Sequence, residues 1–200
     1  MRLLLATHNQ HKRREFARLL PEHEIEALPA SLELPPEDGE TFAHNALGKA
    51  HAASRALGAA TIADDSGIEA AALEGAPGVR SARYAGERAT DEENLAKLLR
   101  EAPAGSRLEY VCALAYFDPA NGVERVFEER CAGHLANRPC GSGGFGYDPA
   151  FLPDDGPAGL TMAELSDAQK DAISHRGRAA RALRAWLEQV DRGGGPDRDR

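Results

Sequence analysis

The feature that most constrains the fold is a pair of apolar segments joined by a turn sequence. Residues Leu108–Phe117 and Val123–Arg130 flank Asp118-Pro119-Ala120-Asn121-Gly122, whose proline, asparagine and glycine favour a chain reversal. We therefore predict a β-hairpin between the two segments. The longest apolar run in the chain, Tyr110–Phe117, lies in the first of them and is far shorter than the ~20 residues that a membrane-spanning helix needs.

Helical patterns alternate with short apolar segments along the rest of the chain. Capping boxes begin at Thr90, Thr161 and Ser166, and the last pattern places Leu183, Trp186, Leu187 and Val190 on one helical face. The expected helices include residues 12–20, 41–57 and 90–100, and the expected short strands are Leu3–Ala6, Ile25–Leu28 and Thr61–Ala63. This alternation, together with the hairpin, predicts an α/β fold with a mixed sheet.

The length of 200 residues corresponds to one domain. We predict that residues 1–190 form it and that residues 191–200, rich in glycine and charge, form a disordered tail. The apolar segment at the N-terminus, Leu3–Ala6, is too brief for a secretory signal. The cysteines Cys112, Cys131 and Cys140 form no C-x-x-C pattern, which excludes a disulfide framework or a zinc knuckle. We therefore expect a cytoplasmic protein with reduced thiols.

The charge balance limits the partners. The chain has 24 Lys and Arg against 32 Asp and Glu, a net charge of −8. Proteins that clamp duplex DNA present strongly basic surfaces, so we expect no nucleic-acid partner and, from the lack of a long apolar run, no membrane partner. A small phosphorylated ligand is not excluded, because it needs only a few local cations.

A first candidate site is the turn between the first strand and the first helix. It comprises Thr7, His8, Asn9, Gln10, His11 and Lys12. A helix N-terminus offers free N–H groups and a positive dipole end, which suit a phosphate, and Lys12 adds a full charge. In the alternative, Asn9 merely caps the helix and Lys12 is solvated. The local sequence alone favours this alternative, because it lacks the glycines of a Walker motif.

A second candidate is Asp64-Asp65, directly after an apolar strand. Carboxylates at the carboxyl edge of a sheet are suited to Mg²⁺. Successive side chains of a strand point to opposite faces, so at most one of the pair enters a cleft unless the backbone bends. A plain turn closed by Ser66-Gly67 explains the residues equally well.

Two further candidates lie in the last third of the chain. Residues 141–149 combine glycines with Phe145 and Tyr147, and this pattern favours a loop that approaches and stacks on a planar base. Lys170 precedes Ser174-His175-Arg176-Gly177, where cations and donors could meet phosphate and ring acceptors. For this last segment an exposed helix junction is the favoured alternative when it is taken alone. The four candidates together describe a nucleoside polyphosphate site with one metal, but they do not fix the bond that is cleaved.

Six segments, in order, carry a family resemblance. They are Thr7-His8-Asn9…Lys12, Gly39-x-Thr41-Phe42-x-x-Asn45-Ala46…Lys49-Ala50, Ala63-Asp64-Asp65-Ser66-Gly67, Gly75-Ala76-Pro77-Gly78…Ser81-Ala82-Arg83-Tyr84, Gly143-Gly144-Phe145-Gly146-Tyr147-Asp148-Pro149 and Ala172-Ile173-Ser174-His175-Arg176-Gly177. Over residues 2–190 the chain resembles the inosine/xanthosine triphosphate pyrophosphatase family. One departure is His44, where the family often has Glu.

The resemblance implies a fold, a reaction and partners. The fold is a long central mixed sheet flanked by helices, in two lobes with a nucleotide cleft between them. The reaction hydrolyses ITP, dITP or XTP to the monophosphate and pyrophosphate, with Mg²⁺ as cofactor, and keeps deaminated purines out of DNA and RNA. The enzyme is usually a homodimer.

The resemblance also implies a role for each matching residue. Asp65 is the proton acceptor for the attacking water and a Mg²⁺ ligand, with Glu37 as second carboxylate or Asp38 in its place. The remaining substrate-binding residues are Thr7, His8, Asn9, Gln10, His11 and Lys12 for phosphates, Ser66, Phe145, Gly146, Tyr147 and Asp148 for substrate, base and sugar, and Lys170, His175 and Arg176 to complete the site, with Lys49 and Arg83 as weaker candidates. Donors such as Arg176 would favour the 6-keto group of hypoxanthine or xanthine over the amino group of adenine.

Two other functions fit the same residues less well. A septum-inhibitor-like pyrophosphatase, acting on modified or pyrimidine nucleotides, is disfavoured by the Phe145–Asp148 and Ser174–Arg176 motifs. A nucleotide-sensing module without catalysis is disfavoured by the intact Asp65.

Overall fold

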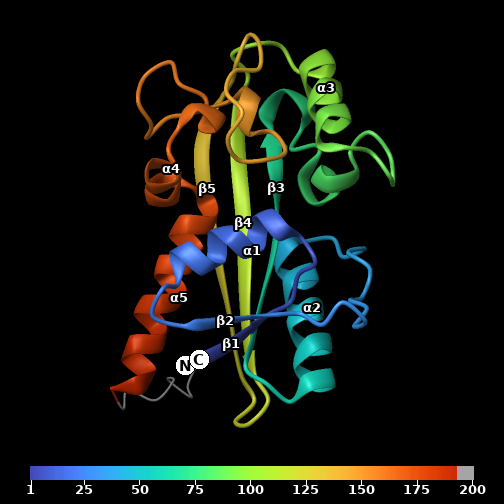
Figure 1. The fold of residues 1–200 in the computed structure, drawn as a ribbon. Helices are drawn as coiled ribbons and strands as arrows, with labels where there is room; N and C mark the ends of the chain where they lie inside the picture. Colours follow the sequence, from blue (N-terminus) through green and yellow to red (C-terminus); the bar gives the residue numbers. More distant parts are fainter. Residues whose placement is uncertain (193–200) are drawn as a thin grey trace.

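The computed structural model describes residues 1–192, and its centre is a six-stranded mixed sheet (Figure 1). The strands lie in the order β2 (Glu24–Ala27), β1 (Arg2–Leu5), β3 (Thr61–Ala70), β4 (Arg107–Asp118), β5 (Val123–Leu135) and β6 (Phe151–Pro153). Strand β1 is parallel to β2 and β3, and the other pairs are antiparallel. The predicted α/β class with a long mixed sheet is thus confirmed.

In residues 1–192, five α-helices and four short 3₁₀ helices surround the sheet. They are α1 (Gln10–Leu19), α2 (Phe42–Leu57), α3 (Asp91–Glu101), α4 (Asp167–Ile173), α5 (His175–Asp191), η1 (Ala71–Leu73), η2 (Gly78–Arg83), η3 (Asp148–Ala150) and η4 (Met162–Glu164). All three predicted capping boxes form, at α3, α4 and η4. None of these helices is long and apolar enough to cross a membrane.

The predicted hairpin forms the spine of the molecule. Strands β4 and β5 pair from Arg107↔His134 to Asp118↔Val123, and both run further than the apolar segments alone indicated. Figure 1 shows β3, β4 and β5 extending along the molecule, with β1, β2 and α2 at one end and α3 at the other. The strands therefore connect the two ends rigidly and fix where residues on one end face residues on the other.

The core consists of three apolar clusters arranged around this spine. Helix α2 packs its alanine face on one side of β3 and β4, and α5 packs Leu183 and Leu187 on the other side together with Phe16 of α1. At the far end, Leu98 of α3 and Phe151 of β6 belong to a third cluster. On the predicted C-terminal face, Trp186 is only partly buried, against Phe127.

The structure corrects the predicted end of β3. The strand continues through Asp64 and Asp65 to Ala70, because each of its residues pairs with β4, as in Asp64↔Leu114 and Asp65↔Ala113. The pair therefore lies in mid-strand, not at a strand end or in a turn. The predicted division of the two side chains between opposite faces is confirmed, since Asp64 contacts α1 and α5 whereas Asp65 contacts α2.

The domain boundary at residue 190 stays a prediction. Most of the predicted disordered tail, from residue 193 onward, lies outside the described residues.

Candidate active site

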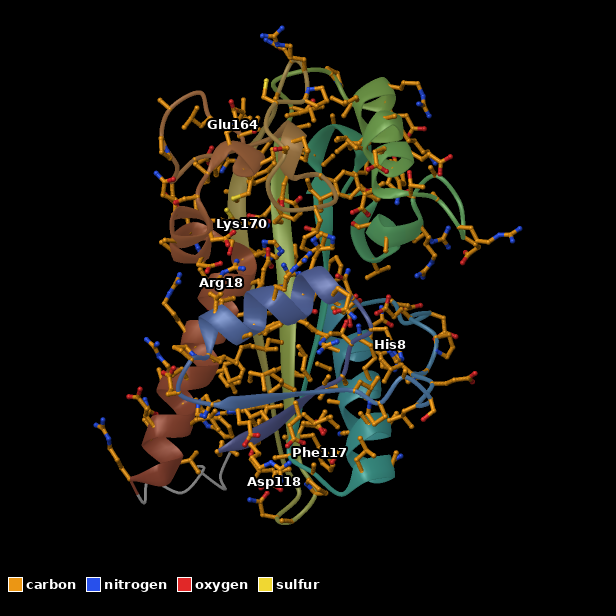
Figure 2. The ribbon with its side chains drawn as sticks, viewed as in Figure 1. His8, Arg18, Phe117, Asp118, Glu164 and Lys170 are labelled. Atoms are coloured by element: carbon orange, nitrogen blue, oxygen red, sulfur yellow. The ribbon has the colours of Figure 1, made fainter. Side chains whose placement is uncertain are left out.

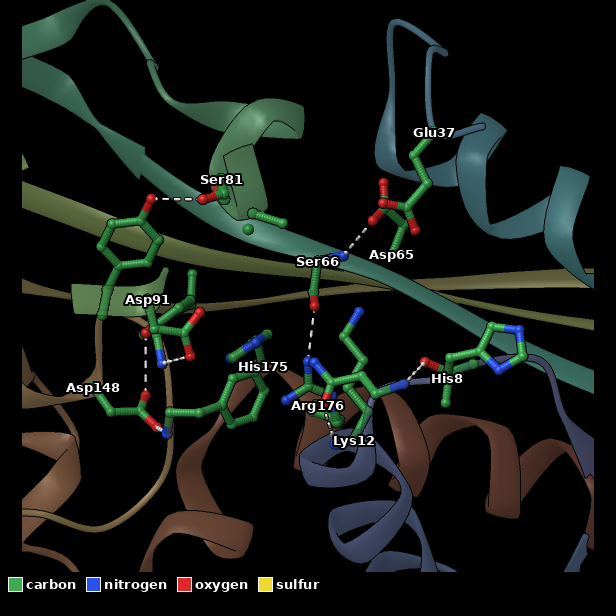
Figure 3. Close-up of a pocket in the computed structure, with 18 of the residues that line it drawn as sticks. His8, Lys12, Glu37, Asp65, Ser66, Ser81, Asp91, Asp148, His175 and Arg176 are labelled. Carbon is green, nitrogen blue, oxygen red and sulfur yellow. Dashed lines mark hydrogen bonds between the residues drawn. The ribbon is translucent and has the colours of Figure 1, made fainter. Parts of the chain in front are cut away.

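A cavity of about 370 Å³ lies between the two ends of the sheet (Figure 3). Its walls come from the β1–α1 turn, the loop before α2, strand β3, helix η2, the glycine-rich loop and the α4–α5 junction. The predicted residues in the lining are Thr7, His8, Asn9, Lys12, Glu37, Lys49, Asp65, Ser66, Phe145, Gly146, Tyr147, Asp148, Lys170, His175 and Arg176. The structure thus brings together residues from all four sequence segments.

The cavity lies along the open edge of β3. Strand β1 pairs with β3 only at Leu4↔Thr61 and Leu5↔Ile62, so within the described chain no strand adjoins this edge at the acidic pair. Side chains from both faces of β3 can therefore reach the same space. This explains why Asp65 and Ser66 both line the cavity although they point to opposite faces.

At the β1–α1 turn the helix cap of the alternative interpretation forms, but its solvated Lys12 does not. Asn9 caps α1, since its Oδ1 accepts the N–H groups of His11 and Lys12 at 2.8 and 3.2 Å. Lys12 is not solvated, however: its side chain is 13% exposed and its Nζ lies 2.9 Å from Asp64 Oδ1. Burial would lower the pKa of Lys12, but Asp64 raises it above its ordinary value, so the cation is held at the cavity.

Several predicted residues lie outside the cavity lining, among them Gln10, Arg83 and His11. Gln10 accepts a hydrogen bond from Arg13 on the exposed side of α1, and Arg83 donates to the main-chain oxygen of Glu37 at 2.5 Å. The His11 ring packs on Phe145, with ring centroids 5.1 Å apart, and so borders the cavity from outside.

The α4–α5 junction is buried, which corrects the alternative of an exposed junction. Ser174 ends α4 and caps α5, and Arg176 is 2% exposed. The guanidinium donates from Nη1 to Glu15 at 2.5 Å and from Nη2 to Asp64 at 3.1 Å and Ser66 at 2.7 Å. A fully buried arginine of this kind is held by its carboxylates and is not a free surface cation.

The sequence analysis missed Glu15, which belongs to the buried network behind the cavity, and also the lining residues Asp91 and Tyr110. The Glu15 carboxylate bridges Arg176 Nη1 and Lys170 Nζ, the latter at 2.7 Å. Burial would raise the pKa of Glu15, but the two cations hold it below its ordinary value. The available signal was the spacing Lys12–Glu15, which places both on one face of α1, but a charge-rich helix suggests a solvated surface.

The Asp65 side of β3 carries a second group of contacts. Asp65 accepts hydrogen bonds from Asn45 Nδ2 at 2.8 Å and from the Ser66 N–H at 3.1 Å. Lys49 Nζ donates to Glu37 and to the main-chain oxygen of Asp64, and it lies 3.9 Å from Asp65 Oδ1. Burial raises the pKa of Asp65 above its ordinary value, whereas Lys49 holds that of Glu37 below. Figure 3 shows Glu37 and Asp65 next to one another at the cavity wall.

The donor set at this wall is suited to Mg²⁺. Glu37 and Asp65 offer carboxylate oxygens, and no group of three or more His, Cys, Asp or Glu side chains close enough to hold a metal occurs in residues 1–192. Magnesium is usually bound by one or two carboxylates, with water and substrate phosphate completing its shell. Asp38 is exposed and does not line the cavity, so the structure favours Glu37 as the second carboxylate.

The glycine-rich loop is fastened at the opposite wall. Asp148 accepts from the Phe145 N–H at 2.9 Å, from Lys170 Nζ at 2.6 Å and from the Tyr110 hydroxyl at 3.1 Å. At Gly144, where φ is +68°, a Cβ would collide with the Asp148 carboxylate, so only glycine fits. These contacts leave the Phe145 ring over the cavity, 5.2 Å from Lys170 Nζ.

Tyr147, in this loop, and His175, at the start of α5, also line the cavity. The Tyr147 hydroxyl donates to the main-chain oxygen of Ser81 at 2.7 Å and so anchors the loop. His175 stacks on Tyr110 with centroids 4.5 Å apart, and among the described residues its buried Nδ1 has no hydrogen-bond partner. Burial, reinforced by Arg176, lowers the pKa of His175 well below its ordinary value. His175 is therefore a neutral imidazole in the cavity lining, and its unpartnered Nδ1 is covered by the surrounding residues.

Known proteins are similar to this chain over most of its length. The chain is 43% identical over 194 residues to a dITP/XTP pyrophosphatase of Methylacidiphilum infernorum, covering 93% of this chain and 94% of that one. It is 46% identical to a dITP/XTP pyrophosphatase of Geobacillus kaustophilus, with 96% and 97% covered. The structure of the Staphylococcus aureus Ham1 protein superposes with a TM-score of 0.82 at 38% identity, covering 95% of this chain and 100% of that one. Since the profile of the Ham1 family also matches residues 3–186, the chain belongs to the Ham1 family.

Proposed function

We propose that this protein hydrolyses deaminated purine nucleoside triphosphates (ITP, dITP and XTP) to the monophosphate and pyrophosphate. The observation that carries the proposal is one cavity that unites the carboxylates of Asp65 and Glu37 with a helix N-terminus and buried cations. The relatives named dITP/XTP pyrophosphatase support the choice of substrate.

Asp65 and Glu37 would hold Mg²⁺. When bound, the metal would neutralise phosphate charge and make pyrophosphate a better leaving group. These two residues fit Mg²⁺ because both present carboxylate oxygens at one wall of the cavity, and oxygen ligands are the kind that Mg²⁺ prefers.

Asp65 accepts the proton of the attacking water. The water oxygen forms a bond to the α-phosphorus, the bond between that phosphorus and the bridging oxygen to the β-phosphorus breaks, and pyrophosphate leaves with the bond electrons. Burial supports this role, because it raises the pKa of the Asp65 carboxyl and so makes the carboxylate a stronger base.

The remaining residues bind and orient the nucleotide. The turn Thr7–Lys12 and Lys170 balance the phosphates, Ser66 contacts substrate, and Phe145 stacks on the base beside Gly146, Tyr147 and Asp148. His175 completes the nucleotide site from the start of α5.

Arg176 retains part of its capacity to read the base. Its contacts within the chain use Nε–H, one Nη1–H and both Nη2–H groups, which leaves one Nη1–H for the 6-keto oxygen. That donor rewards a keto base and mismatches the amino group of adenine.

The resemblance supports two further expectations that concern the whole protein. We expect a homodimer and a cytoplasmic location, in keeping with a role in cleansing the nucleotide pool.

The first test is incubation with ITP, XTP, GTP and ATP, with and without Mg²⁺, and identification of products by anion-exchange chromatography. The proposal requires IMP and pyrophosphate from ITP, dependence on Mg²⁺, and little turnover of ATP. Formation of IDP and phosphate would overturn attack at the α-phosphorus. Binding of ITP without turnover would indicate a sensing module instead.

The second test is Asp65→Asn, which keeps size and removes the base. Turnover of ITP should fall at least ~1000-fold while the melting temperature stays within a few degrees. Asp118→Asn is the control, because Asp118 lies at the tip of the β4–β5 hairpin, distant from Lys170 and His8 (Figure 2). Near wild-type turnover by Asp65→Asn would show that another group is the base.

A further inference from the structure

Asn45 on α2 contacts two separate parts of the carboxylate wall. Its side chain is buried, with the residue 5% exposed. The amide nitrogen Nδ2 donates to Asp65 Oδ2 at 2.8 Å, and the amide oxygen Oδ1 accepts the main-chain N–H of Gly39 at 2.8 Å. One side chain thus joins β3 to the loop before α2, and both ends of the amide are used.

The loop that Asn45 holds carries Glu37. Gly39 follows Glu37 by two residues, and a Cβ at Gly39 would lie 2.6 Å from Asn45 Oδ1, so glycine allows the close approach. One helical turn after Asn45, Lys49 donates to the Glu37 carboxylate and to the main-chain oxygen of Asp64. The same face of α2 therefore contacts both carboxylates and the strand between them.

We propose that Asn45 is a positioning residue that holds Asp65 and Glu37 as a preformed pair; the proposal rests on the function assigned to these carboxylates above. Among the described residues the Asp65 carboxylate has few other restraints: the N–H of the next residue donates to it, and Lys49 Nζ lies 3.9 Å from Oδ1. Asparagine suits the position because it presents a donor to Asp65 and an acceptor to Gly39 at once, whereas aspartate retains only the acceptor and alanine neither. A displacement of about 1 Å at a reacting group can cost about 100-fold in rate.

Two variants separate the donor from the acceptor. Asn45→Asp keeps the size and the acceptor for Gly39 but replaces the donor to Asp65 with a carboxylate oxygen that repels it, and Asn45→Ala loses both contacts. With saturating ITP and Mg²⁺ we expect kcat to fall at least ~50-fold in both variants, while KM for ITP changes less than about threefold. If Asn45 served only to fasten the loop, Asn45→Asp would remain within about threefold of wild type, and that result would overturn the proposal.

Asn94→Ala is the matched control. Asn94 is 2% exposed and likewise makes two hydrogen bonds, but to main-chain groups of Ala85 and Ala82 and not to a carboxylate. We expect Asn94→Ala and Asn45→Ala to lower the melting temperature by similar amounts, with kcat retained within about threefold only in Asn94→Ala. An equal loss of kcat in the control would assign the effect to general destabilisation and overturn the proposal.

Binding of Mn²⁺ to the nucleotide-free protein, measured by electron paramagnetic resonance, tests the arrangement without turnover. Asn45→Ala should weaken Mn²⁺ binding at least ~5-fold relative to wild type, and Asn94→Ala should leave it unchanged. If wild type fails to hydrolyse ITP but this contrast holds, the proposed function is wrong and the positioning role stands. If wild type neither hydrolyses ITP nor binds Mn²⁺, there is no carboxylate site to arrange and the positioning role is overturned.

Discussion

Arg176 and Arg130 each contact several carboxylates, but in very different surroundings. Arg176 is 2% exposed and bonds to Glu15 and Asp64, both buried. Arg130 lies on the sheet surface with its side chain 42% exposed and bonds to Glu69 and two other glutamates. Removing one partner of a buried pair leaves an uncompensated charge, whereas water compensates an exposed one.

Arg176→Ala should therefore unfold more easily as well as lose base discrimination. We expect the free energy of unfolding to fall by about 3–5 kcal/mol, because Glu15 and Asp64 each lose one of their two cationic partners and keep only Lys170 and Lys12. Arg130→Ala, the control, should cost about 1 kcal/mol or less. Urea denaturation of both variants measures the difference. Equal losses would contradict the buried network.

The second carboxylate of the metal wall can be identified by two neighbouring substitutions. Glu37→Gln should raise the Mg²⁺ concentration required for half-maximal rate at least ~5-fold, because Glu37 lines the cavity beside Asp65. Asp38→Asn should leave that concentration unchanged, because Asp38 is exposed outside the lining. Titration of the rate with Mg²⁺ decides between them, and the reverse pattern would assign the role to Asp38.

At the scale of single residues, the sequence predicted those interactions whose partners are close neighbours in the chain. The cap at Asn9 was weighed from its own neighbours in the chain, and it forms. The burial of Lys12 and Glu15 arises from Asp64, Lys170 and Arg176, which are distant in the chain and become neighbours only after folding. Candidate chemistry was therefore predictable from the sequence, but the partners that hold each group were not.

The helices and strands follow the same rule: the sequence predicted those that adjacent residues determine, but not those that depend on tertiary contacts. The β4–β5 hairpin and the capping boxes are encoded by adjacent residues, and each was predicted. The continuation of β3 past Asp64 depends on pairing with β4, from Asp65↔Ala113 to Ala70↔Leu108, which is distant in the chain, so the polar residues suggested an end to the strand. The break at Ser174 between α4 and α5 likewise has a tertiary component, since it lets Arg176 turn inward to β3.

Two helical glycines test how tightly this break is packed. At Gly177, the third residue of α5, an added Cβ would collide with the main-chain oxygen of Asp171 in α4, whereas at Gly48 in α2 it would meet nothing within 4 Å. Gly177→Ala should destabilise the protein by about 1–3 kcal/mol and reduce turnover by displacing His175 and Arg176. Gly48→Ala should stabilise it by up to about 1 kcal/mol. Thermal denaturation distinguishes them, and a neutral Gly177→Ala would show that the two helices can move apart freely.

For the whole molecule, the charge distribution bears on how a polyanion is bound. The chain carries a net charge of −8. Among the described residues, the cavity and its buried network contain four cationic side chains and six carboxylates: Lys12, Lys49, Lys170 and Arg176 against Glu15, Glu37, Asp64, Asp65, Asp91 and Asp148. Most of these cations are already paired, so the cavity offers little uncompensated positive charge to a triphosphate.

The divalent cation should therefore affect the affinity for the nucleotide as well as the rate of turnover. We expect an α,β-methylene analogue of ITP, which resists hydrolysis at the α-phosphorus, to bind at least ~10-fold more weakly in EDTA than in millimolar Mg²⁺, because the carboxylates of Asp65 and Glu37, which Lys49 offsets only in part, then face the phosphates. Isothermal titration calorimetry measures both dissociation constants. Inosine, which has no phosphates, is the control, and its affinity should not change with Mg²⁺. Equal affinity of the analogue with and without Mg²⁺ would mean that the β1–α1 turn and Lys12 alone balance the phosphates.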